Sequence, residues 1–217
     1  MKEKKKNRCI GLKYLGYDFV RFNGWPGLIF FRPKKIYISQ AAKKPIKGGA
    51  ILVSNHISLV DPMYLMITFW KRRHHFVAMK DLFEGRFNNW LFTKVFLALK
   101  IDRDNMSIGA FKDIINHLKN DDLVSIFPEG HVNVDEKGVK TFKSGMVMMA
   151  LQSKKPIIPV YIKRRKHWYS RLKVAVGEPI DVFNFKGGKP LTIKDIEEVT
   201  QYIEEQEKKL EEFVERK

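Results

Sequence analysis

The chain has only one cysteine, Cys9, among its 217 residues. A single thiol excludes an internal disulfide framework and fits a reducing compartment. Long hydrophobic runs are also missing, because no uncharged apolar stretch approaches the roughly 18–20 residues that a transmembrane helix needs. The basic start Met1-Lys-Glu-Lys-Lys-Lys is not followed by the apolar stretch of a secretory signal. We therefore expect a protein that stays on the cytoplasmic side.

Acidic residues are scarce relative to basic ones. The chain has 41 Lys and Arg residues against 24 Asp and Glu residues, which gives a formal net charge of +17. Such a charge predicts attraction to an anionic partner, whether nucleic acid, an anionic membrane or a phosphorylated ligand. Charge alone does not choose among the three.

The apolar residues suffice for one sizeable core, and their pattern predicts an α/β fold. They make up 44% of the chain, and nothing in its length demands two domains. Short β-rich segments are expected at residues 36–39, 50–54, 75–79, 122–127, 157–162 and 172–176. Helical patterns lie between them, at residues 62–71, 89–98, 106–119 and 143–153. This alternation predicts a layered α/β fold with a mixed, largely parallel sheet flanked by helices.

The two ends of the chain carry different helical patterns. In residues 1–34, large apolar groups alternate with cations, and basic runs flank them. We interpret this segment as an amphipathic helix or helical hairpin, broken near Gly24 and Pro26, that binds an anionic membrane surface. A helix docked on the core is the alternative. Residues 191–217 follow the capping pair Thr192 and Asp195 and predict an amphipathic helix packed on the core, residues 35–190.

The stretch Ala50-Ile-Leu-Val-Ser-Asn-His56 ends an apolar strand in a histidine, and Asp61-Pro62 follows five residues later. The carboxyl end of a buried strand is where open α/β sheets usually place ligands. Asp61 followed by Pro62 also suits the start of a helix, so Asp61 is either a cap or a partner for His56. Taken alone, the pair is a weak indication of a site.

Further stretches raise the significance of this pair. The segment Asn55-His56-Ile-Ser-Leu-Val-Asp61 resembles the Asn-His-x-x-x-x-Asp signature of the glycerolipid acyltransferases typified by 1-acylglycerol-3-phosphate acyltransferase. Later stretches resemble the family's other blocks in the same order, and they are Lys80-Asp-Leu-Phe, Leu99-Lys-Ile-Asp-Arg103, Phe127-Pro-Glu129-Gly130, Phe142-Lys143-Ser-Gly145 and Pro156-Ile-Ile-Pro159. The resemblance spans about residues 35–179.

The resemblance implies an O-acyltransferase that moves a fatty acyl group from acyl-coenzyme A or acyl-carrier protein to a lysophospholipid. An imidazole is the natural general base for activating a hydroxyl near neutral pH, which fits His56, and a carboxylate such as Asp61 would fix its tautomer. A thiol with a pKa of about 8.5 leaves more readily than an alcohol, so these two catalytic residues suffice. We find no covalent route, because the sequence has no Gly-x-Ser-x-Gly elbow. We expect no cofactor and no metal.

Other motif residues are expected to bind the substrate. By the resemblance, Arg103 would hold a phosphate, while Glu129 and Gly130 would shape the acceptor site. The remaining substrate-binding candidates are Asn55, Lys80 and Lys143.

One position departs from the family. The third block usually continues Gly-Thr-Arg-Ser, whereas this chain reads Gly130-His-Val132-Asn. The acceptor is therefore 1-acyl-sn-glycerol-3-phosphate, another lysophospholipid or a glycolipid.

Three other functions are compatible with single features of the sequence. A nucleic-acid binder is disfavoured because the aromatic residues lie in apolar runs and no nucleic-acid signature is present, so we expect no specific nucleic acid. A metalloenzyme is disfavoured because its candidate ligands have no recognised ligand spacing; these are His56, Asp61, His74, His75 and His131. We place His74 and His75 in a solvated connection. A non-catalytic lipid-binding protein of the same fold remains open. For both the acyltransferase and the lipid-binding protein, we expect a peripheral, monotopic protein at the cytoplasmic face of a membrane.

Overall fold

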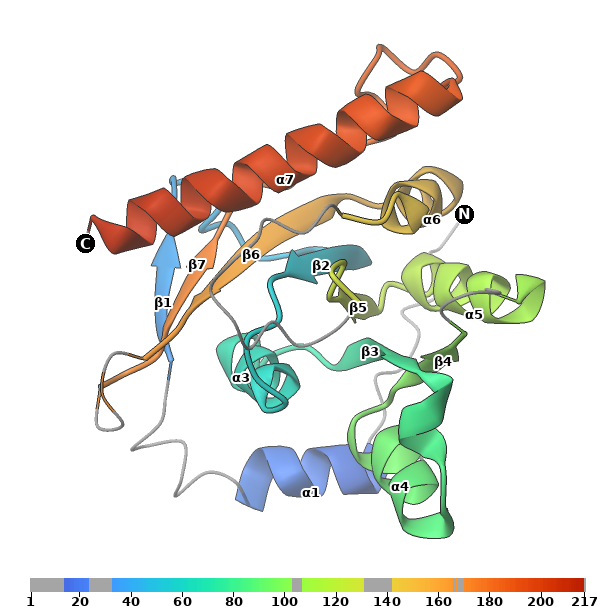
Figure 1. Cartoon of the computed structure of the whole chain (residues 1–217), viewed down its shortest axis with the longest axis vertical. Coiled ribbons are helices and arrows are strands. Elements are labelled where there is room, and N and C mark those ends of the chain that lie inside the picture. The colour runs from blue at the N-terminus through green and yellow to red at the C-terminus, as the bar shows by residue number, and fades with distance from the viewer. Residues whose placement is uncertain are drawn as a thin grey trace, which may run out of the picture.

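The fold is built on one seven-stranded sheet. A computed structural model describes residues 14–23, 33–102, 107–130, 142–165, 167 and 170–216. The sheet has the order β1-β7-β6-β2-β5-β3-β4, and β6 pairs antiparallel with β7 while every other neighbouring pair is parallel (Figure 1). The strands are β1 (Lys34–Tyr37), β2 (Ala50–Ser54), β3 (His74–Met79), β4 (Leu99–Ile101), β5 (Leu123–Ile126), β6 (Ile157–Lys163) and β7 (Lys173–Val176). The mixed, largely parallel sheet predicted from the sequence is confirmed.

Helices cover the sheet. They are α1 (Leu15–Asn23), α3 (Asp61–Thr68), α4 (Arg86–Trp90), α5 (Ile108–Lys119), α6 (Gly145–Ser153) and α7 (Ile193–Glu215). A 3₁₀ turn, η2 (Lys80–Phe83), precedes α4, and a π-helical turn, η3 (Leu91–Val95), follows it. The single helix predicted at 89–98 is therefore wrong in detail, because the segment begins as α4 and then widens into η3.

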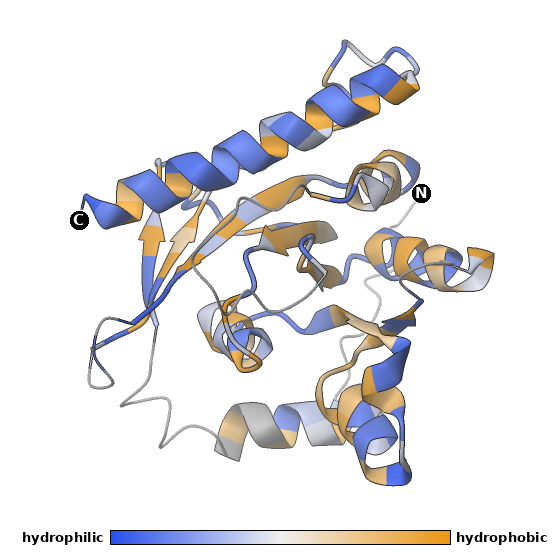
Figure 2. Cartoon of the chain, viewed as in Figure 1, coloured by the Kyte–Doolittle hydropathy of each residue, from blue (hydrophilic) through white to orange (hydrophobic). Residues whose placement is uncertain are grey.

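The central strand β2 shows how the two layers of helices share the sheet. All five of its residues are buried. Ile51 and Val53 pack with residues of α5, α6 and α7, whereas Ala50 and Leu52 pack with residues of α1 and α3. Because successive side chains of a strand point to opposite faces, an uninterrupted apolar run is what a strand covered on both faces requires. Figure 2 shows the central strands as mostly hydrophobic.

The C-terminal helix α7 lies across one face of the sheet (Figure 1). Its buried apolar stripe consists of Val199, Ile203, Leu210 and Val214. Thr192 and Asp195 form the predicted capping box, in which each side chain bonds the backbone N–H of the other residue. The rest of the helix is largely hydrophilic (Figure 2).

The helix α1 is docked on the core through one side. Tyr17 is fully buried, and its hydroxyl accepts a hydrogen bond from the backbone N–H of His74. The carboxylate of Asp18 accepts two hydrogen bonds from the guanidinium of Arg73. On its other side, α1 exposes Phe19 and Phe22. The helix α1 is thus docked on the core and also has an exposed apolar side. The predicted break near Gly24 and Pro26 lies outside the described residues.

The placement of His74 and His75 in a solvated connection is wrong. Both side chains are buried in β3. Burial lowers the pKa of His74 to about 3, which keeps its ring neutral, and Nδ1 lies 3.1 Å from Oγ of Ser125. The preceding Arg72 does not extend into solvent, because its guanidinium donates to the backbone carbonyls of Ile46 and Gly48. The buried strand β3 can therefore begin directly after the basic residues Arg72 and Arg73.

Within the described part of the chain, none of the helices has both the length and the apolar character required to cross a bilayer.

The close approach of the backbone at Gly49 gives a test of this packing. A Cβ at this position would collide with the carbonyl oxygen of Leu118 at the end of α5. We expect Gly49→Ala to lower the free energy of unfolding by about 3 kcal/mol, which is at the upper end for overpacking. Urea denaturation measures this change. The control is Gly109→Ala on the exposed first turn of α5, where the stability should stay equal or rise by up to about 1 kcal/mol. Equal effects of the two substitutions would contradict the packing described.

Candidate active site

The carboxyl ends of five strands meet at one edge of the sheet. The strands β6, β2, β5, β3 and β4 run parallel to one another, so the residues that follow them lie on the same side. His56 follows β2, Glu129 follows β5, and Lys80 follows β3. The sheet therefore gathers residues that lie far apart in the sequence, at the edge where open α/β sheets usually bind ligands.

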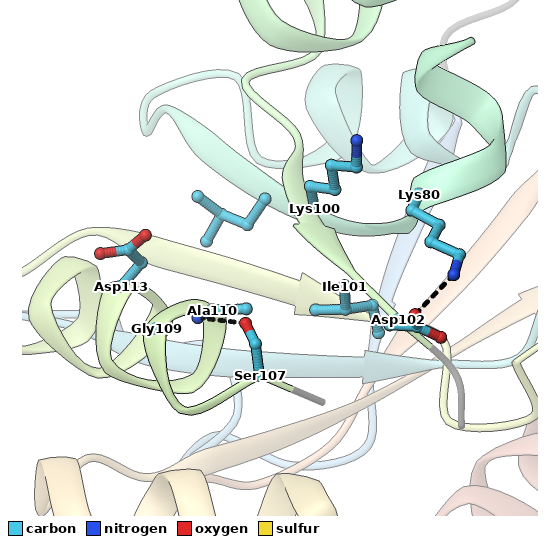
Figure 3. A pocket seen from close by; sticks show the side chains of 9 residues that line it. Lys80, Lys100, Ile101, Asp102, Ser107, Gly109, Ala110 and Asp113 are labelled. Atoms are coloured by element: carbon cyan, nitrogen blue, oxygen red, sulfur yellow. Dashed lines mark hydrogen bonds and ion pairs between the residues drawn. The ribbon is translucent and has the colours of Figure 1, made fainter. Parts of the chain in front are cut away.

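At the outer end of this edge lies a pocket of about 410 Å³ (Figure 3). Lys80 and Asp102 line one side, and the first turn of α5 lines the other. Nζ of Lys80 lies 2.6 Å from Oδ2 of Asp102. The Lys80 side chain is about half exposed, and exposed ion pairs contribute little to stability, so an anionic ligand can compete for this ammonium group. Arg103, which follows directly, lies outside the described residues.

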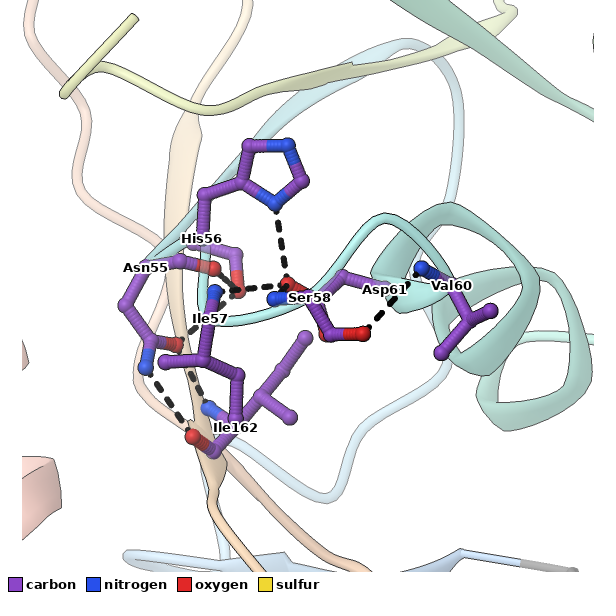
Figure 4. Close-up of polar contacts among 8 residues, drawn as sticks. Asn55, His56, Ile57, Ser58, Val60, Asp61 and Ile162 are labelled. Atoms are coloured by element: carbon purple, nitrogen blue, oxygen red, sulfur yellow. Dashed lines mark hydrogen bonds and ion pairs between the residues drawn. The ribbon is translucent and has the colours of Figure 1, made fainter. Parts of the chain in front are cut away.

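Nearer the centre of the sheet, His56 and Asp61 form a hydrogen-bonded pair (Figure 4). Nδ1 of His56 lies 2.9 Å from Oδ2 of Asp61. The carboxylate can only accept, so Nδ1 carries the hydrogen of the neutral ring and Nε2 presents its lone pair. Nε2 makes no hydrogen bond to any residue that the structure describes. The ring is thus held in the tautomer that can take up a proton.

The local fold explains why Asp61 turns back toward His56. Asp61 is the first residue of α3, and Val60 holds the N-cap position without a side-chain cap. The same oxygen, Oδ2, accepts hydrogen bonds of 2.7 Å from the backbone N–H groups of Ile57 and Ser58. The turn between β2 and α3 is therefore wrapped around a fully buried carboxylate. Of the two roles that the sequence left open, the geometry matches a partner for His56 and not a helix cap.

Two neighbours fix the position of the His56 ring. The ring of Phe127 stacks on it, with centroids 4.2 Å apart and an interplanar angle of 20°. The amide of Asn55 bonds the backbone of Ile162 in β6, through Nδ2 to the carbonyl at 2.9 Å and through Oδ1 to the N–H at 2.7 Å. Asn55 therefore holds the end of β2 to β6, and the expected contact of Asn55 with substrate stays a prediction. The sequence did not indicate the stacking role of Phe127.

The third block lies beside the pair. Glu129 and Gly130 lie in the turn after β5, where the N–H of Gly130 donates to the carbonyl of Phe127. Gly130 has a φ of 72°, which a side chain would strain. The turn therefore requires glycine at this position.

Behind Glu129 lies a buried carboxyl group that sequence reasoning missed. Glu207 of α7 is only 7% exposed. Burial first, and then the negative charge of Glu129, raise the pKa of Glu207 well above its ordinary value, while the backbone N–H of Asn55 acts in the opposite direction. A sequence signal existed, because Glu207 occupies the gap in the apolar stripe between Ile203 and Leu210.

The other predicted binding residues are less constrained. Lys143 is exposed and lies two residues before α6. This helix connects the carboxyl end of β5 to the amino end of β6, so its first turn faces the same edge of the sheet. His131 and Val132 lie outside the described residues.

The protonation of Glu207 gives a prediction about stability. A carboxyl group with a raised pKa in the folded state stabilises fully below its ordinary value of 4.5, and this stability is lost as the pH rises toward the folded-state pKa. We expect the free energy of unfolding of the wild type to fall relative to Glu207→Gln as the pH rises above about 4.5, by at most about 1.4 kcal/mol per pH unit.

Urea denaturation at several pH values measures this difference. Glu205→Gln, on the exposed side of the same helix, is the matched control and should parallel the wild type. A wild type and a Glu207→Gln variant with the same pH dependence would contradict the raised pKa of Glu207.

Comparison with known proteins identifies the family. The family model described as Acyltransferase matches residues 35–163, which is more than half of the chain. A 1-acyl-sn-glycerol-3-phosphate acyltransferase of Bacillus subtilis is 27% identical over 178 residues, covering 78% of this chain and 86% of that protein. The enzyme of the same name from Streptococcus pneumoniae is 33% identical over 142 residues, covering 63% of this chain and 52% of that protein.

A solved structure has the same fold. The crystal structure of the 1-acyl-sn-glycerophosphate acyltransferase from Thermotoga maritima superposes with a TM-score of 0.64 and 22% sequence identity, covering 91% of this chain and 79% of that one. The sequence match and the shared fold agree with the order of the motif blocks along the chain. The chain therefore belongs to the glycerolipid acyltransferase family and is an O-acyltransferase.

Proposed function

We propose that the protein transfers a fatty acyl group from an acyl thioester to the free hydroxyl of 1-acyl-sn-glycerol-3-phosphate, which gives phosphatidic acid. The observation that carries this proposal is the contact of 2.9 Å between Nδ1 of His56 and the buried Oδ2 of Asp61, which leaves Nε2 to accept a proton. The names of the relatives support the choice of acceptor, because several are 1-acyl-sn-glycerol-3-phosphate acyltransferases.

In the proposed reaction, Nε2 of His56 takes the proton of the acceptor hydroxyl as its oxygen bonds to the thioester carbonyl carbon. The bond from carbon to sulfur then breaks, and the departing thiolate takes the proton from the imidazolium. The carboxylate of Asp61 stabilises the imidazolium while it exists. Because a thiolate is a good leaving group, no separate strong acid is needed. The stacked ring of Phe127 keeps the imidazole in place throughout.

The acceptor phosphate is proposed to bind among the cations at the same edge. Lys80 at the pocket, Lys143 before α6 and Arg103 are the candidates, and Glu129 orients the glycerol hydroxyls. The basic run at the end of β6 is less available. Lys163 is paired with Glu215 at 2.7 Å, and the guanidinium of Arg165 donates to the hydroxyl of Tyr64.

The acyl donor is acyl-coenzyme A or acyl-carrier protein, and no cofactor takes part in this reaction scheme. Both donors are anionic, one through its phosphates and the other through its acidic surface, and the net charge of +17 suits either. The acceptor is proposed to reach the site from a membrane.

We propose that the membrane-facing surface extends beyond the N-terminal segment to α4. In addition to Phe19 and Phe22 of α1, the side chains of Phe87 and Trp90 in α4 are more than half exposed. The two helices lie at the end of the molecule opposite α7 (Figure 1). Aromatic side chains beside cations suit the headgroup region of an anionic membrane. The protein would then bind peripherally at the cytoplasmic face.

A second acceptor has one specific observation in its favour. Val132 stands where the third block of the family usually has an arginine. Without that guanidinium, the site has one fewer charged group to hold a phosphate monoester. Another lysophospholipid or a glycolipid is therefore the alternative acceptor for the same chemistry.

An acceptor panel tests the proposed function. Wild-type protein is given palmitoyl-coenzyme A or palmitoyl-acyl-carrier protein with lysophosphatidic acid, other lysophospholipids or a monoacylated glycolipid, and the lipid products are identified by mass spectrometry. We expect phosphatidic acid as the main product. We expect His56→Ala to lower its rate of formation about 100-fold to 10,000-fold, because general-base catalysis contributes about 10²–10⁴-fold.

Two results would count against the proposal. His167→Ala, which removes a histidine outside this pair, is the control and should keep the wild-type rate. A folded His56→Ala protein with the same rate as this control would make His56 structural. A wild type that acylates only a different acceptor would replace the proposed substrate with the alternative.

The membrane surface on α4 predicts a change in partitioning. We expect the double variant Phe87→Ser/Trp90→Ser to bind anionic vesicles at least about tenfold more weakly. Burial of one large apolar side chain is worth about 1.5–3 kcal/mol, and about 1.4 kcal/mol corresponds to a factor of ten. Vesicle sedimentation measures the change. Ile193→Ser removes an exposed apolar residue at the start of α7 and should have no effect. Unchanged binding by the double variant would place the membrane contact elsewhere.

A further inference from the structure

At the opposite edge of the sheet, three side chains with metal-binding atoms converge. His75 lies near the amino end of β3, His117 lies in the last turn of α5, and Asp122 directly precedes β5. Their ligand atoms all lie within 4.8 Å of one another. The strand β5 separates this cluster from Phe127, and its rise of about 3.3 Å per residue places the cluster about 16 Å from the ring that stacks on His56. The cluster is therefore distinct from the candidate active site.

The distances within the cluster are close to those of a coordinated metal. Nδ1 of His117 donates a hydrogen bond of 2.9 Å to Oδ2 of Asp122, so a metal ion would replace this hydrogen, and the same oxygen lies 3.7 Å from Nε2 of His75. The two imidazole rings have centroids 3.9 Å apart. A tetrahedral zinc ion with bonds of about 2.0–2.1 Å has ligand atoms about 3.3 Å apart, which lies between the two observed distances. Small side-chain rotations therefore suffice to close such a site.

The tautomer of His75 is already suited to a metal. Its Nδ1 lies 3.1 Å from the carbonyl oxygen of Leu97, which can only accept, so Nδ1 carries the hydrogen of the neutral ring. Nε2 then presents its lone pair toward the carboxylate of Asp122. Histidine ligands of metals typically donate their other N–H to a carbonyl in this way.

The backbone holds the other two ligands together without the metal. After α5, the N–H of Asp122 donates to the carbonyl of His117 at 3.0 Å. Asp121 between them has a φ of 65°, which turns the chain sharply. Its side chain is held by the N–H of Gly49 and by Lys155. The ligand pair is thus part of a fixed turn, which lowers the entropy lost on binding.

We propose that His75, His117 and Asp122 bind one Zn²⁺ ion. Two imidazoles and one carboxylate form a donor set that suits zinc, and three protein ligands leave a fourth position for water. His75 is buried, whereas the side chains of His117 and Asp122 are 24% and 34% exposed, so an ion can enter from solvent. The nearby cations Arg72 and Lys155 are held by backbone carbonyls and by Asp121.

The ion has a structural role. It links β3, α5 and the start of β5, and so ties a helix to two strands whose carboxyl ends carry active-site groups. A ligand that binds only the folded state raises its stability by mass action. This proposal is independent of the proposed acyl transfer.

The test is a titration of the full-length Cys9→Ser protein, in which the one thiol of the chain cannot supply a ligand. The protein is first treated with a chelator and then titrated with Co²⁺, whose visible absorption is strong in tetrahedral sites and weak in octahedral ones. Calorimetry with Zn²⁺ gives the stoichiometry and the shift in Tm. We expect one ion per chain, a tetrahedral Co²⁺ spectrum displaced by Zn²⁺, and a rise in Tm.

Variants assign the ion to the cluster. We expect His117→Gln and Asp122→Asn, which change partly exposed side chains, to fold as judged by circular dichroism and to lose both the spectrum and the rise in Tm. His167→Gln is the matched control, and His56→Gln excludes binding at the pair of His56 and Asp61; both should keep the Co²⁺ spectrum and the rise in Tm of the wild type. A wild type without the tetrahedral spectrum, or a His117→Gln variant that keeps it, would overturn the proposal and leave the cluster as a hydrogen-bonded pair with a neighbouring ring.

Discussion

The candidate active site depends on the hydrogen bonds that the buried carboxylate of Asp61 accepts. One oxygen accepts from Nδ1 of His56 and from the backbone N–H groups of Ile57 and Ser58. A buried carboxylate is costly unless it is hydrogen-bonded, and here the three donors both offset that cost and determine the shape of the turn. The hydrogen bonds that shape the connection between β2 and α3 therefore also set the tautomer of His56. The local fold and the position of the imidazole ring depend on the same contacts.

The candidate active site and the proposed zinc site lie at opposite edges of the sheet. At its carboxyl edge lie the hydrogen-bonded pair of His56 and Asp61, the third block and the cation of Lys80, each placed by a different parallel strand. At its amino edge lies the histidine and aspartate cluster that we propose as a zinc site. The strand β5 contributes to both edges, with Asp122 before it and Phe127 after it. An open parallel sheet makes this division natural, because the groups at its two edges are separated by the length of a strand.

Much of the fold and the pairing of His56 with Asp61 could be predicted from the sequence, because both depend on local patterns. The bounds of β2 were predicted correctly, since an apolar run preceded by Gly48-Gly49 leaves little choice. The failures involve long-range contacts. The burial of His74 depends on Arg72 and Arg73 folding back onto backbone carbonyls and onto Asp18, and no local pattern contains that information.

The burial of Glu207 and the convergence of His75 with His117 also follow from the tertiary arrangement. Glu207 interrupts an apolar stripe, which predicts a buried carboxyl group but not its neighbour Glu129. His75 meets Asp122 because β3 pairs with β5, and the order of strands in a sheet is not written in the spacing of ligands along the chain. In both cases a single polar residue in an apolar context was the available signal.

The most direct test of the account is to observe the tautomer of His56. Nitrogen-15 NMR of histidine-labelled protein, at a pH where the ring is neutral, distinguishes protonated from unprotonated ring nitrogens, and a His56→Gln sample assigns the signals. The account predicts hydrogen on Nδ1 and a lone pair on Nε2 in the wild type, with loss of this preference in Asp61→Asn. Hydrogen on Nε2 in the wild type, or a tautomer unaffected by Asp61→Asn, would contradict the proposed role of the pair in activating the acceptor hydroxyl.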